Sequence, residues 1–404
     1  MLYDHQKKII DEDPKKCGLF LGTGGGKSRT ALSLARGKTL IIMPKTQFLD
    51  NNWGRELKKL SPEHDIEIFQ MSKETFKRDH EKLARFDTVI IDEAHTIFGV
   101  TPNIRWRNRQ PIPKTSQLFE AAYDYINRTK PKRLYLCTAT PARNPMSVWA
   151  ALTLLGKEID WERWRRSFYV RLPMPGREVW QPKKDVKTLE NLAKIVQTIG
   201  YTGRLQDWFD VPDQVDRYVH CQLSKEEEQR IHELPLEFPD PLVLVGKTHQ
   251  AEQGESKLEV IDDLLAEYPK VLVFARYLDQ IKKIEEHFKG KLPVFVLTGQ
   301  TKDRKKLFED AEKSHQCLFI AQSQVSAGYE LPSFRCVVYA SLSYSFVDYT
   351  QSRGRVLRAN ALNKNLYVHL HSGKVDVAII KCMQGHQDFE EKIYAQGSSV
   401  SNKV

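Results

Sequence analysis

The sequence has few cysteines and lacks any long apolar run. Its six cysteines lie at positions 17, 137, 221, 317, 336 and 382 of 404 residues, and none forms a CxxC pair. This spacing argues against a cysteine-rich zinc site and predicts buried free thiols in a reducing compartment. No apolar run reaches the roughly 18 residues of a membrane span, and the charged N-terminus has no stretch typical of a signal peptide. We therefore expect a cytoplasmic location, or a nuclear one in a eukaryote.

The sequence also lacks internal repeats, low-complexity tracts and an acidic excess. Lys and Arg total 62 and Asp and Glu total 52, which leaves a net charge of +10. The basic residues cluster between Thr101 and Arg133, where eight basic side chains stand against two acidic ones. Such a cluster suits nucleic acid phosphates. A solvated loop face would have the same composition, so the charge alone leaves both interpretations open.

The chain is longer than one hydrophobic core usually fills, and 41% of its residues are hydrophobic. Two stretches alternate short apolar runs with amphipathic segments, which is typical of parallel α/β sheets covered on both faces. In the first stretch we expect strands at 17–21, 39–44, 66–69, 88–92 and 133–139, and helices near 27–36, 48–60 and 115–127. In the second we expect strands at 270–275, 293–297, 317–321, 335–340 and 365–370, and helices near 257–267, 278–289, 302–314, 347–357 and 375–394.

Between these stretches, at about 156–255, the pattern changes. Four tryptophans interleave with arginines there, and prolines are frequent. We interpret this segment as a mostly helical or irregular insertion between two sheet domains at 1–155 and 256–404. Its tryptophans fit core or interdomain packing, and they also fit stacking on nucleotides.

A glycine-rich segment follows the first expected strand and precedes a helix. It reads Gly22-Thr23-Gly24-Gly25-Gly26-Lys27-Ser28. Glycines allow backbone N–H groups to surround phosphates, while a lysine reaches the β- and γ-phosphates and a serine hydroxyl ligates magnesium. The strict pattern has glycine where this chain has Leu21. A glycine-rich turn without a ligand is the alternative, but strand, loop, Lys-Ser pair and helix coincide here, which predicts a phosphate-binding loop with Lys27 and Ser28 in these roles.

An acidic pair ends the expected strand at 88–92. The residues are Asp92-Glu93-Ala94-His95. A carboxylate at the C-terminal end of a parallel strand beside a phosphate loop lies where magnesium must be held. We expect Asp92 to hold the metal through water and Glu93 to accept a proton from an attacking water. Zinc binding by His95 is disfavoured because no second histidine stands four residues away.

A third group of residues lies in the second stretch. Gln351, Arg355 and Arg358 are spaced i, i+4 and i+7, which would place them on one face of a helix. Arginines can stabilise the charge that spreads over a γ-phosphate during its transfer. A solvated basic helix is the alternative. The functional interpretation requires the two sheet domains to face each other across a nucleotide.

These segments resemble motifs I, II, III and VI of superfamily 2 helicases and translocases: Lys27, Asp92-Glu93-Ala94-His95, Thr138-Ala139-Thr140 and Gln351 to Arg358. Other segments resemble the Swi/Snf-like branch of DNA-stimulated ATPases: 2–6, 39–57 with Trp53, 137–155, 270–288, 297–301, 323–333 and 385–394. The resemblance covers almost the whole chain and is loosest at 156–255. Glu330 stands where the branch has Asp or Asn, and no chromatin-reading module is attached, so the chain is most similar to a compact bacterial or bacteriophage-type member.

The resemblance implies an ATP-driven motor with two RecA-like lobes that sandwich ATP and Mg²⁺, acting on double-stranded or branched DNA through its phosphate backbone. Gln6 would read the adenine, Gln351 would contribute to the nucleotide site, and Arg355 and Arg358 would complete it. His95, Thr138 and Thr140 would couple the nucleotide and nucleic-acid sites. The expected nucleic-acid contacts are Lys45, Thr46, Ser72, Lys73, Arg105, Arg107, Arg109, Gly299, Gln300, Thr301, Ser323 and Ser326.

Two other functions remain open at this point. The same motor could be a strand-separating DNA or RNA helicase that prefers single strands, and stimulation of its ATPase by duplex or single-stranded nucleic acid would distinguish the two. A nucleic-acid-binding scaffold with vestigial ATPase activity is disfavoured because Lys27, Glu93, Arg355 and Arg358 are all present.

Overall fold

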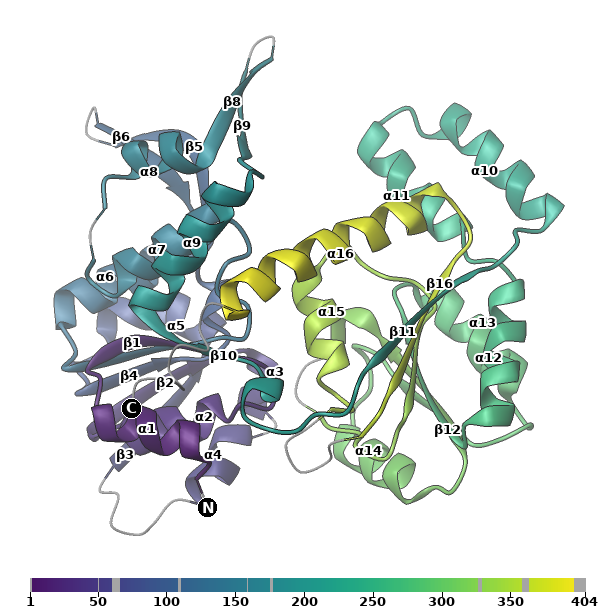
Figure 1. Ribbon diagram of the computed structural model, residues 1–404, viewed down its shortest axis with the longest axis horizontal. Helices are drawn as coiled ribbons and strands as arrows, with labels where there is room; N and C mark the ends of the chain where they lie inside the picture. The colour runs from purple at the N-terminus through teal and green to yellow at the C-terminus, as the bar shows by residue number, and fades with distance from the viewer. Residues whose placement is uncertain are drawn as a thin grey trace. The chain divides into compact units, whose positions relative to one another are not determined.

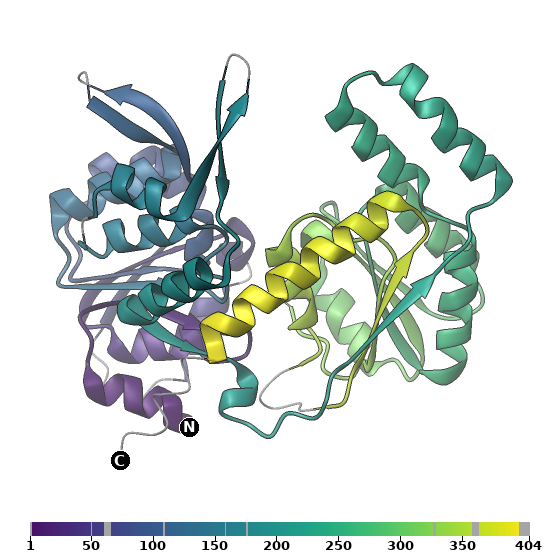
Figure 2. The same cartoon turned by 45° about the horizontal axis from the view of Figure 1, so that its top comes forward.

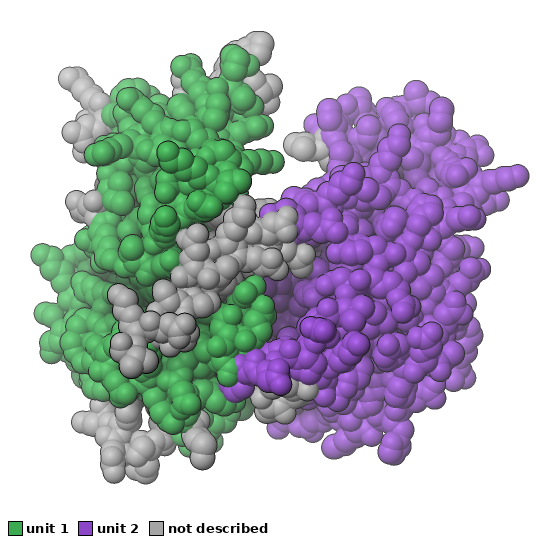
Figure 3. Space-filling view, viewed as in Figure 1, with its two compact units in different colours: residues 1–208, 389–404 green, residues 209–388 purple. Residues whose placement is uncertain are grey.

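The structure is a computed structural model that describes residues 2–49, 51–59, 66–107, 110–157, 159–174, 177–325, 329–357 and 363–395. The chain divides into two compact units (Figure 3). Unit 1 comprises residues 1–208 together with 389–404, and unit 2 comprises residues 209–388. Each unit is built around one six-stranded sheet.

The sheet of unit 1 is parallel throughout and has the order β10-β1-β7-β4-β2-β3 (Figure 1). Its strands are β1 (Lys16–Leu21), β2 (Gly37–Met43), β3 (Ile66–Ser72), β4 (Thr88–Ile91), β7 (Arg133–Cys137) and β10 (Gly200–Gly203). Because all strands run the same way, their C-terminal ends meet at one edge of the sheet, which is where α/β folds place ligands.

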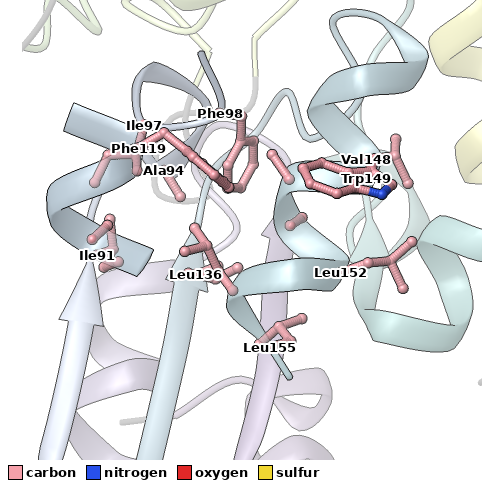
Figure 4. Close-up of a cluster of buried hydrophobic side chains, with 14 of the residues drawn as sticks. Ile91, Ala94, Ile97, Phe98, Phe119, Leu136, Val148, Trp149, Leu152 and Leu155 are labelled. Atoms are coloured by element: carbon pink, nitrogen blue, oxygen red, sulfur yellow. The ribbon is translucent and has the colours of Figure 1, made fainter. Parts of the chain in front are cut away.

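Alternate residues of these strands pack on opposite faces of the sheet, as strand geometry requires. On one face, Ile91 and Leu136 pack with Phe119 and Trp149 in a large apolar cluster (Figure 4). On the other, Ile90 and other strand residues pack against the first helices. The helices of unit 1 are α1 (Asp4–Glu12), α2 (Lys27–Leu34), α3 (Lys45–Leu49), α4 (Asn52–Leu57), α5 (Lys73–Asp79), α6 (Gln117–Thr129), α7 (Pro145–Leu154), α8 (Trp161–Phe168) and α9 (Val186–Ile199).

Two antiparallel hairpins extend from the same end of unit 1 (Figures 1 and 2). They are formed by β5 (Val100–Arg107) with β6 (Gln110–Thr115), and by β8 (Tyr169–Met174) with β9 (Arg177–Pro182). Arg165 joins them. Its guanidinium lies 4.6 Å from the ring centroid of Trp161 and 4.2 Å from that of Trp180, and it donates to the Pro102 carbonyl oxygen at 3.1 Å. These tryptophan and arginine residues therefore pack together.

The sheet of unit 2 is also parallel and has the order β11-β16-β15-β12-β14-β13. Its strands are β11 (Val215–His220), β12 (Lys270–Ala275), β13 (Val294–Leu297), β14 (Cys317–Gln322), β15 (Cys336–Tyr339) and β16 (Leu366–His371). Apolar clusters cover both faces. The helices are α10 (Lys225–Glu237), α11 (Pro241–Ala251), α12 (Ser256–Glu267), α13 (Leu278–Phe288), α14 (Arg304–Lys313), α15 (Phe346–Arg353) and α16 (Lys374–Ala395), of which α16 belongs to unit 2 as far as residue 388.

The expected α/β architecture with two parallel sheets is confirmed, and each unit has a RecA-like arrangement of strands and helices. All ten expected strands are present. The segment 156–255, however, is not one separate insertion: β10 adds to the first sheet and β11 to the second, so the segment is divided between the two units. Two further expectations need correction. The expected helix at 48–60 is two short helices, α3 and α4, and the one at 347–357 ends at Arg353.

All six cysteines are free thiols, five of them buried and Cys382 exposed. Within the described part of the chain, no helix has the length and apolarity needed to cross a membrane.

Candidate nucleotide site and neighbouring surfaces

The glycine-rich loop connects β1 to α2. Gly24 (φ 82°) and Gly26 (φ 75°) adopt the left-handed conformation, which a residue without a Cβ reaches at little cost. The loop is fixed to the sheet because the Gly22 amide donates to the Gly203 carbonyl oxygen of β10 at 2.7 Å. Thr23 lies in the turn that the Gly25 amide closes by donating to the Gly22 carbonyl oxygen at 3.0 Å. The loop therefore leads directly into a helix N-terminus, a position that favours anions.

The side chain of Lys27 folds back over this loop. Its ammonium donates to the carbonyl oxygens of Leu21 at 2.9 Å and Gly22 at 3.2 Å. Ser28 follows in the first turn of α2. An ammonium held by two neutral carbonyl oxygens can exchange them for phosphate oxygens, because hydrogen bonds to an anion are stronger.

Gln6 of α1 contacts the other end of the loop. Its buried side-chain amide donates to the Gly26 carbonyl oxygen at 3.1 Å and to the Thr30 hydroxyl at 3.3 Å. Its side-chain oxygen accepts from the Tyr3 amide at 2.9 Å. Gln6 therefore lies beside the phosphate loop, and its side-chain amide is held by protein groups.

The acidic pair follows β4 at the same edge of the sheet. The Asp92 carboxylate is buried and accepts from the Trp53 indole N–H at 2.9 Å and from the Glu93 amide at 2.9 Å. Glu93 adopts φ 44°, which is uncommon for a residue with a side chain. Trp53 of α4, noted in the sequence only as a branch-typical residue, thus orients Asp92.

Burial raises the pKa of Asp92, the Glu93 carboxylate raises it further, and Trp53 and Lys73 offset this only in part. Burial also disfavours the ionised form of Glu93. The hydrogen bond with His95 and the charges of Lys27 and Lys73 outweigh that effect, so the pKa of Glu93 is lowered. An ionised Glu93 can accept a proton. A divalent cation at Asp92 would favour ionisation of that carboxylate too.

His95 links the acidic pair to the segment after β7. Its Nδ1 lies 3.3 Å from the Glu93 carboxylate and 2.9 Å from the Thr138 hydroxyl. The Thr138 hydroxyl also accepts from the Thr140 amide at 3.1 Å. The Thr140 hydroxyl is buried with no hydrogen-bond partner among the described residues. The structure therefore brings His95, Thr138 and Thr140 together in one chain of contacts that starts at Glu93.

Ser72 and Lys73, expected to contact nucleic acid, are instead buried within unit 1. The Ser72 hydroxyl caps α5 by accepting from the Thr75 amide at 3.2 Å. The Lys73 ammonium donates to the Glu93 carbonyl oxygen at 2.7 Å and to the Thr96 hydroxyl. Both side chains are occupied by internal hydrogen bonds, so this structure gives them a structural role and corrects the expected surface contact.

The basic group in unit 2 does not lie on one helical face as expected. Helix α15 ends at Arg353, and Gly354 begins a turn, so Arg355 follows the helix. The buried Arg355 guanidinium donates to the carbonyl oxygens of Gln351 at 2.9 Å and Tyr329 at 2.7 Å. Arg358 lies outside the described residues.

Arg353, which sequence reasoning passed over, has the most extensive contacts of this segment. Its guanidinium forms a two-pronged ion pair with Asp216 of β11 and lies 3.8 Å from the ring centroid of Tyr367. His369 of β16 also contacts the Asp216 carboxylate at 2.8 Å. Arg353 therefore attaches α15 to the edge of the second sheet. The i, i+4, i+7 spacing in the sequence selects Arg355 and not Arg353.

The remaining expected nucleic-acid contacts lie in several places. Lys45 is exposed and Thr46 partly exposed at the start of α3. Gly299, Gln300 and Thr301 form a turn after β13 in which the Thr301 amide donates to the Thr298 carbonyl oxygen at 3.2 Å. Ser323 is buried, and its hydroxyl has no hydrogen-bond partner among the described residues.

Arg105 of β5 is partly exposed and pairs with Glu120 at 2.8 Å. Arg107 ends the same strand. Arg109 and Ser326 lie outside the described residues. Among the residues that are described, no group of three or more His, Cys, Asp or Glu side chains is arranged to hold a metal ion.

Four strands of the unit 2 sheet, β12 to β15, and the turns after β13 and α15 lie in a segment that matches a known sequence family. Residues 256–360 match the family described as the helicase conserved C-terminal domain. Unit 2 carries a helicase C-terminal domain. A comparison with curated proteins finds no match.

This helicase domain supports membership of helicase superfamily 1 or 2. It implies an ATP-hydrolysing, helicase-type enzyme that acts on nucleic acid. The matched residues include Gln351, Arg355 and the turn at Gly299 to Thr301, whereas Lys27 and Asp92 lie in the part of the chain before the match.

Proposed function

We propose that this protein is an ATP-driven motor of superfamily 2, of the Swi/Snf-like branch, that translocates on or remodels double-stranded or branched DNA. The observation that carries the proposal is the placement of Lys27 and Glu93. Both follow the C-terminal ends of strands, β1 and β4, that are separated in the sheet only by β7. The charge of Lys27 contributes to the lowered pKa of Glu93, so the two side chains belong to one electrostatic site.

The residues present fit ATP and Mg²⁺. Gly24 and Gly26 have positive φ values, which suit a tight anion-binding turn, and the Lys27 ammonium donates to two carbonyl oxygens that phosphate oxygens could replace. Asp92 is a buried carboxylate with a raised pKa, and a bound cation would lower that pKa again. The Ser28 hydroxyl is the second oxygen ligand that Mg²⁺ would use. Bound Mg²⁺ would neutralise charge on the phosphates of ATP.

In this proposal Glu93 accepts the proton of the attacking water, because its carboxylate is held in the ionised form. Lys27 binds phosphate oxygens, and Gln6 recognises the base. Arg355 and Arg358 act on the charge that develops on the γ-phosphate. His95 passes a change at Glu93 to Thr138 and Thr140 through the contacts described above.

Nucleic acid would bind through its phosphate backbone. The candidates that remain accessible are Lys45, Thr46, the turn from Gly299 to Thr301 and the basic β5–β6 hairpin, where Trp106 is 69% exposed. The sequence from Val100 to Thr115 contains four basic and no acidic residues. Contacts of this type neutralise phosphates without reading sequence, so binding should weaken steeply with salt.

The test is one titration of ATPase rate against duplex DNA, single-stranded DNA, forked DNA and RNA. We expect the largest stimulation with duplex or forked DNA. The Lys27→Ala variant should lose ATP hydrolysis and keep nucleic-acid binding, whereas Lys38→Ala, an exposed lysine of β2, should keep both. Normal turnover by Lys27→Ala would refute the phosphate-loop assignment. Stimulation by single strands alone would favour a single-strand helicase.

A further inference from the structure

Trp208 is a residue whose position the proposed function does not yet explain. It follows the short helix Leu205–Asp207 and is the last residue of the main part of unit 1. The chain before it forms β10, which pairs in parallel with β1, so that Gly203 is the register partner of Leu21. The chain thus returns to the start of the phosphate loop 182 residues later, since Gly203 pairs with Leu21.

The indole of Trp208 fills the space beside two glycines. A Cβ added to Gly25 would lie 2.8 Å from Trp208 Cζ3, and one added to Gly203 would lie 2.2 Å from Trp208 Cζ2. Neither glycine has a positive φ. Their lack of a side chain is therefore needed for the close approach of the indole and not for an unusual backbone conformation.

His5 covers the indole from α1. The two rings are stacked with centroids 3.7 Å apart and planes 10° from parallel. Nε2 of His5 lies 3.0 Å from the Gly25 carbonyl oxygen, and since a carbonyl only accepts, Nε2 carries the proton. Burial lowers the pKa of His5, which fits a neutral ring in this stack.

The contacts of His5 and Trp208 fix Gly25, in the middle of the phosphate loop. Gly22 is fixed by Gly203, and Gly26 by Gln6. Gly25, between them, is held by the hydrogen bond from His5 and the packing of Trp208. A loop whose amides must surround a phosphate depends on such support, because a binding site that is already ordered loses less conformational entropy when the ligand binds, which raises the affinity.

Resting on the proposed function, we infer that Trp208, stacked on His5, is a positioning residue of the nucleotide site, and that nucleotide binding at the phosphate loop changes the surroundings of its indole. Trp208 itself contacts no reacting group. Its effect is on the affinity for ATP, through the conformation of Gly25.

Steady-state kinetics test the positioning role. Trp208→Ala should raise KM for ATP by about tenfold or more and change kcat less, because the loop must be ordered again with each binding event. Trp208→Phe should restore most of the affinity, since a phenyl ring can still stack on His5. Equal KM values for Trp208→Ala and the wild type would overturn the inference, as would a loss that Trp208→Phe does not relieve.

A double-mutant cycle separates positioning from general damage. Gly203→Ala should raise KM, because all three of the atoms nearest to its new Cβ belong to the Trp208 indole. In the Trp208→Ala background the same methyl group meets none of these atoms, so Gly203→Ala should add no further loss. Effects that simply multiply would show that the two sites act independently and would overturn the inference.

Fluorine NMR follows the indole directly. Labelling with 4-fluorotryptophan places the fluorine on Cε3, which is not among the indole atoms nearest to either glycine. Trp208→Phe identifies its resonance among those of the seven tryptophans. Mg-ATP should shift this resonance and leave that of Trp149, in the apolar cluster of Figure 4, in place.

A failure of this inference and a failure of the proposed function give different experimental results. ATP that binds and is hydrolysed while the Trp208 resonance does not move would overturn this inference alone. No ATP binding, measured with a fluorescent ATP analogue, would overturn the proposed function and the inference with it.

Discussion

The ammonium group of Lys73 donates a 2.7 Å hydrogen bond to the backbone carbonyl oxygen of Glu93. Lys73 begins α5, directly after β3, and Glu93 follows β4, so the contact crosses the edge of the first sheet. It places a buried cation behind two carboxylates, where its charge favours the ionised form of both Asp92 and Glu93. Burial lowers the pKa of Lys73 to about 8, which is the electrostatic cost of this arrangement.

We predict that Lys73→Gln destabilises the protein by about 3 kcal/mol, because it leaves the Glu93 carbonyl and two carboxylates without their buried cation. Urea unfolding followed by circular dichroism measures the change. The control is Lys77→Gln in the same helix, where the side chain is exposed. Equal midpoints for the two variants would show that Lys73 has no such role and would reopen its assignment as a nucleic-acid contact.

The difference between Lys73 and Lys27 shows what the sequence could predict. Lys27 stands in a contiguous pattern of seven residues between a strand and a helix, and a local pattern of this kind determines its own geometry. The direction of the Lys73 side chain depends on Thr96 and Glu93, which are more than 19 residues away in the sequence. From the sequence alone, an isolated lysine after a strand is equally compatible with a buried and with an exposed side chain.

The edge strands β10 and β11 are not evident in the sequence for a similar reason. Strands β12 and β15 are buried along their whole length and are visible as continuous apolar runs. By contrast, β11 has the sequence VDRYVH and is mostly exposed, and β10 has only four residues, GYTG. Such strands are defined by the neighbour with which they pair and not by their own composition. For this reason the segment 156–255 could not be divided correctly between the two sheets.

We predict different results for the two arginines around Gly354. Arg353→Lys should lower the thermal stability of the protein, because an ammonium cannot make the paired hydrogen bonds to Asp216 or stack on Tyr367 as a planar guanidinium does. Arg355→Lys should lower kcat by about tenfold or more with a smaller change in KM, if Arg355 acts on the transition state.

Differential scanning calorimetry and ATPase kinetics on both variants check this assignment. The reverse pattern, with an unstable Arg355→Lys and a stable Arg353→Lys of low kcat, would exchange the two roles. Equal losses of stability in both would assign both arginines to structure, which the hydrogen bonds of Arg353 to Asp216 and of Arg355 to two carbonyl oxygens would then explain.

Asp216 gives a prediction on pH. Burial alone would raise its pKa, but the hydrogen bonds from His369 and Arg353 outweigh burial and lower the pKa to about 2. A carboxyl group whose pKa is lower in the folded state stabilises the protein above its unfolded pKa, and this stabilisation is lost as the pH falls towards the folded pKa. The contribution should be about 2 kcal/mol at neutral pH and should disappear between about pH 4 and pH 2.

Asp216→Asn should therefore reduce the free energy of unfolding at pH 7 and have little effect near pH 2. Urea unfolding at a series of pH values measures the difference between variant and wild type. Asp262→Asn is a matched control, since this partly exposed aspartate also contacts a histidine, His287. A difference that stays constant from pH 7 to pH 2 would show that the ion pair does not depend on the charge of Asp216.

The β5–β6 hairpin gives a prediction on nucleic-acid binding. Arg105 lies on this hairpin and is 43% exposed, although it also contacts Glu120. If the hairpin binds DNA phosphates, Arg105→Ala should weaken duplex binding and reduce the slope of log Kd against log salt by about 1, because each phosphate contact contributes about 0.9 to that slope. Lys132→Ala removes the same charge from the same basic window and also breaks one ion pair, with Asp87 at 2.9 Å, but Lys132 lies between α6 and β7, outside the hairpin. Fluorescence anisotropy with a labelled duplex at several salt concentrations measures both variants. Because the two changes lower the net charge equally, a smaller slope for Arg105→Ala alone would locate the phosphate contact at the hairpin, whereas equal slopes would mean that the hairpin contributes only to the overall charge.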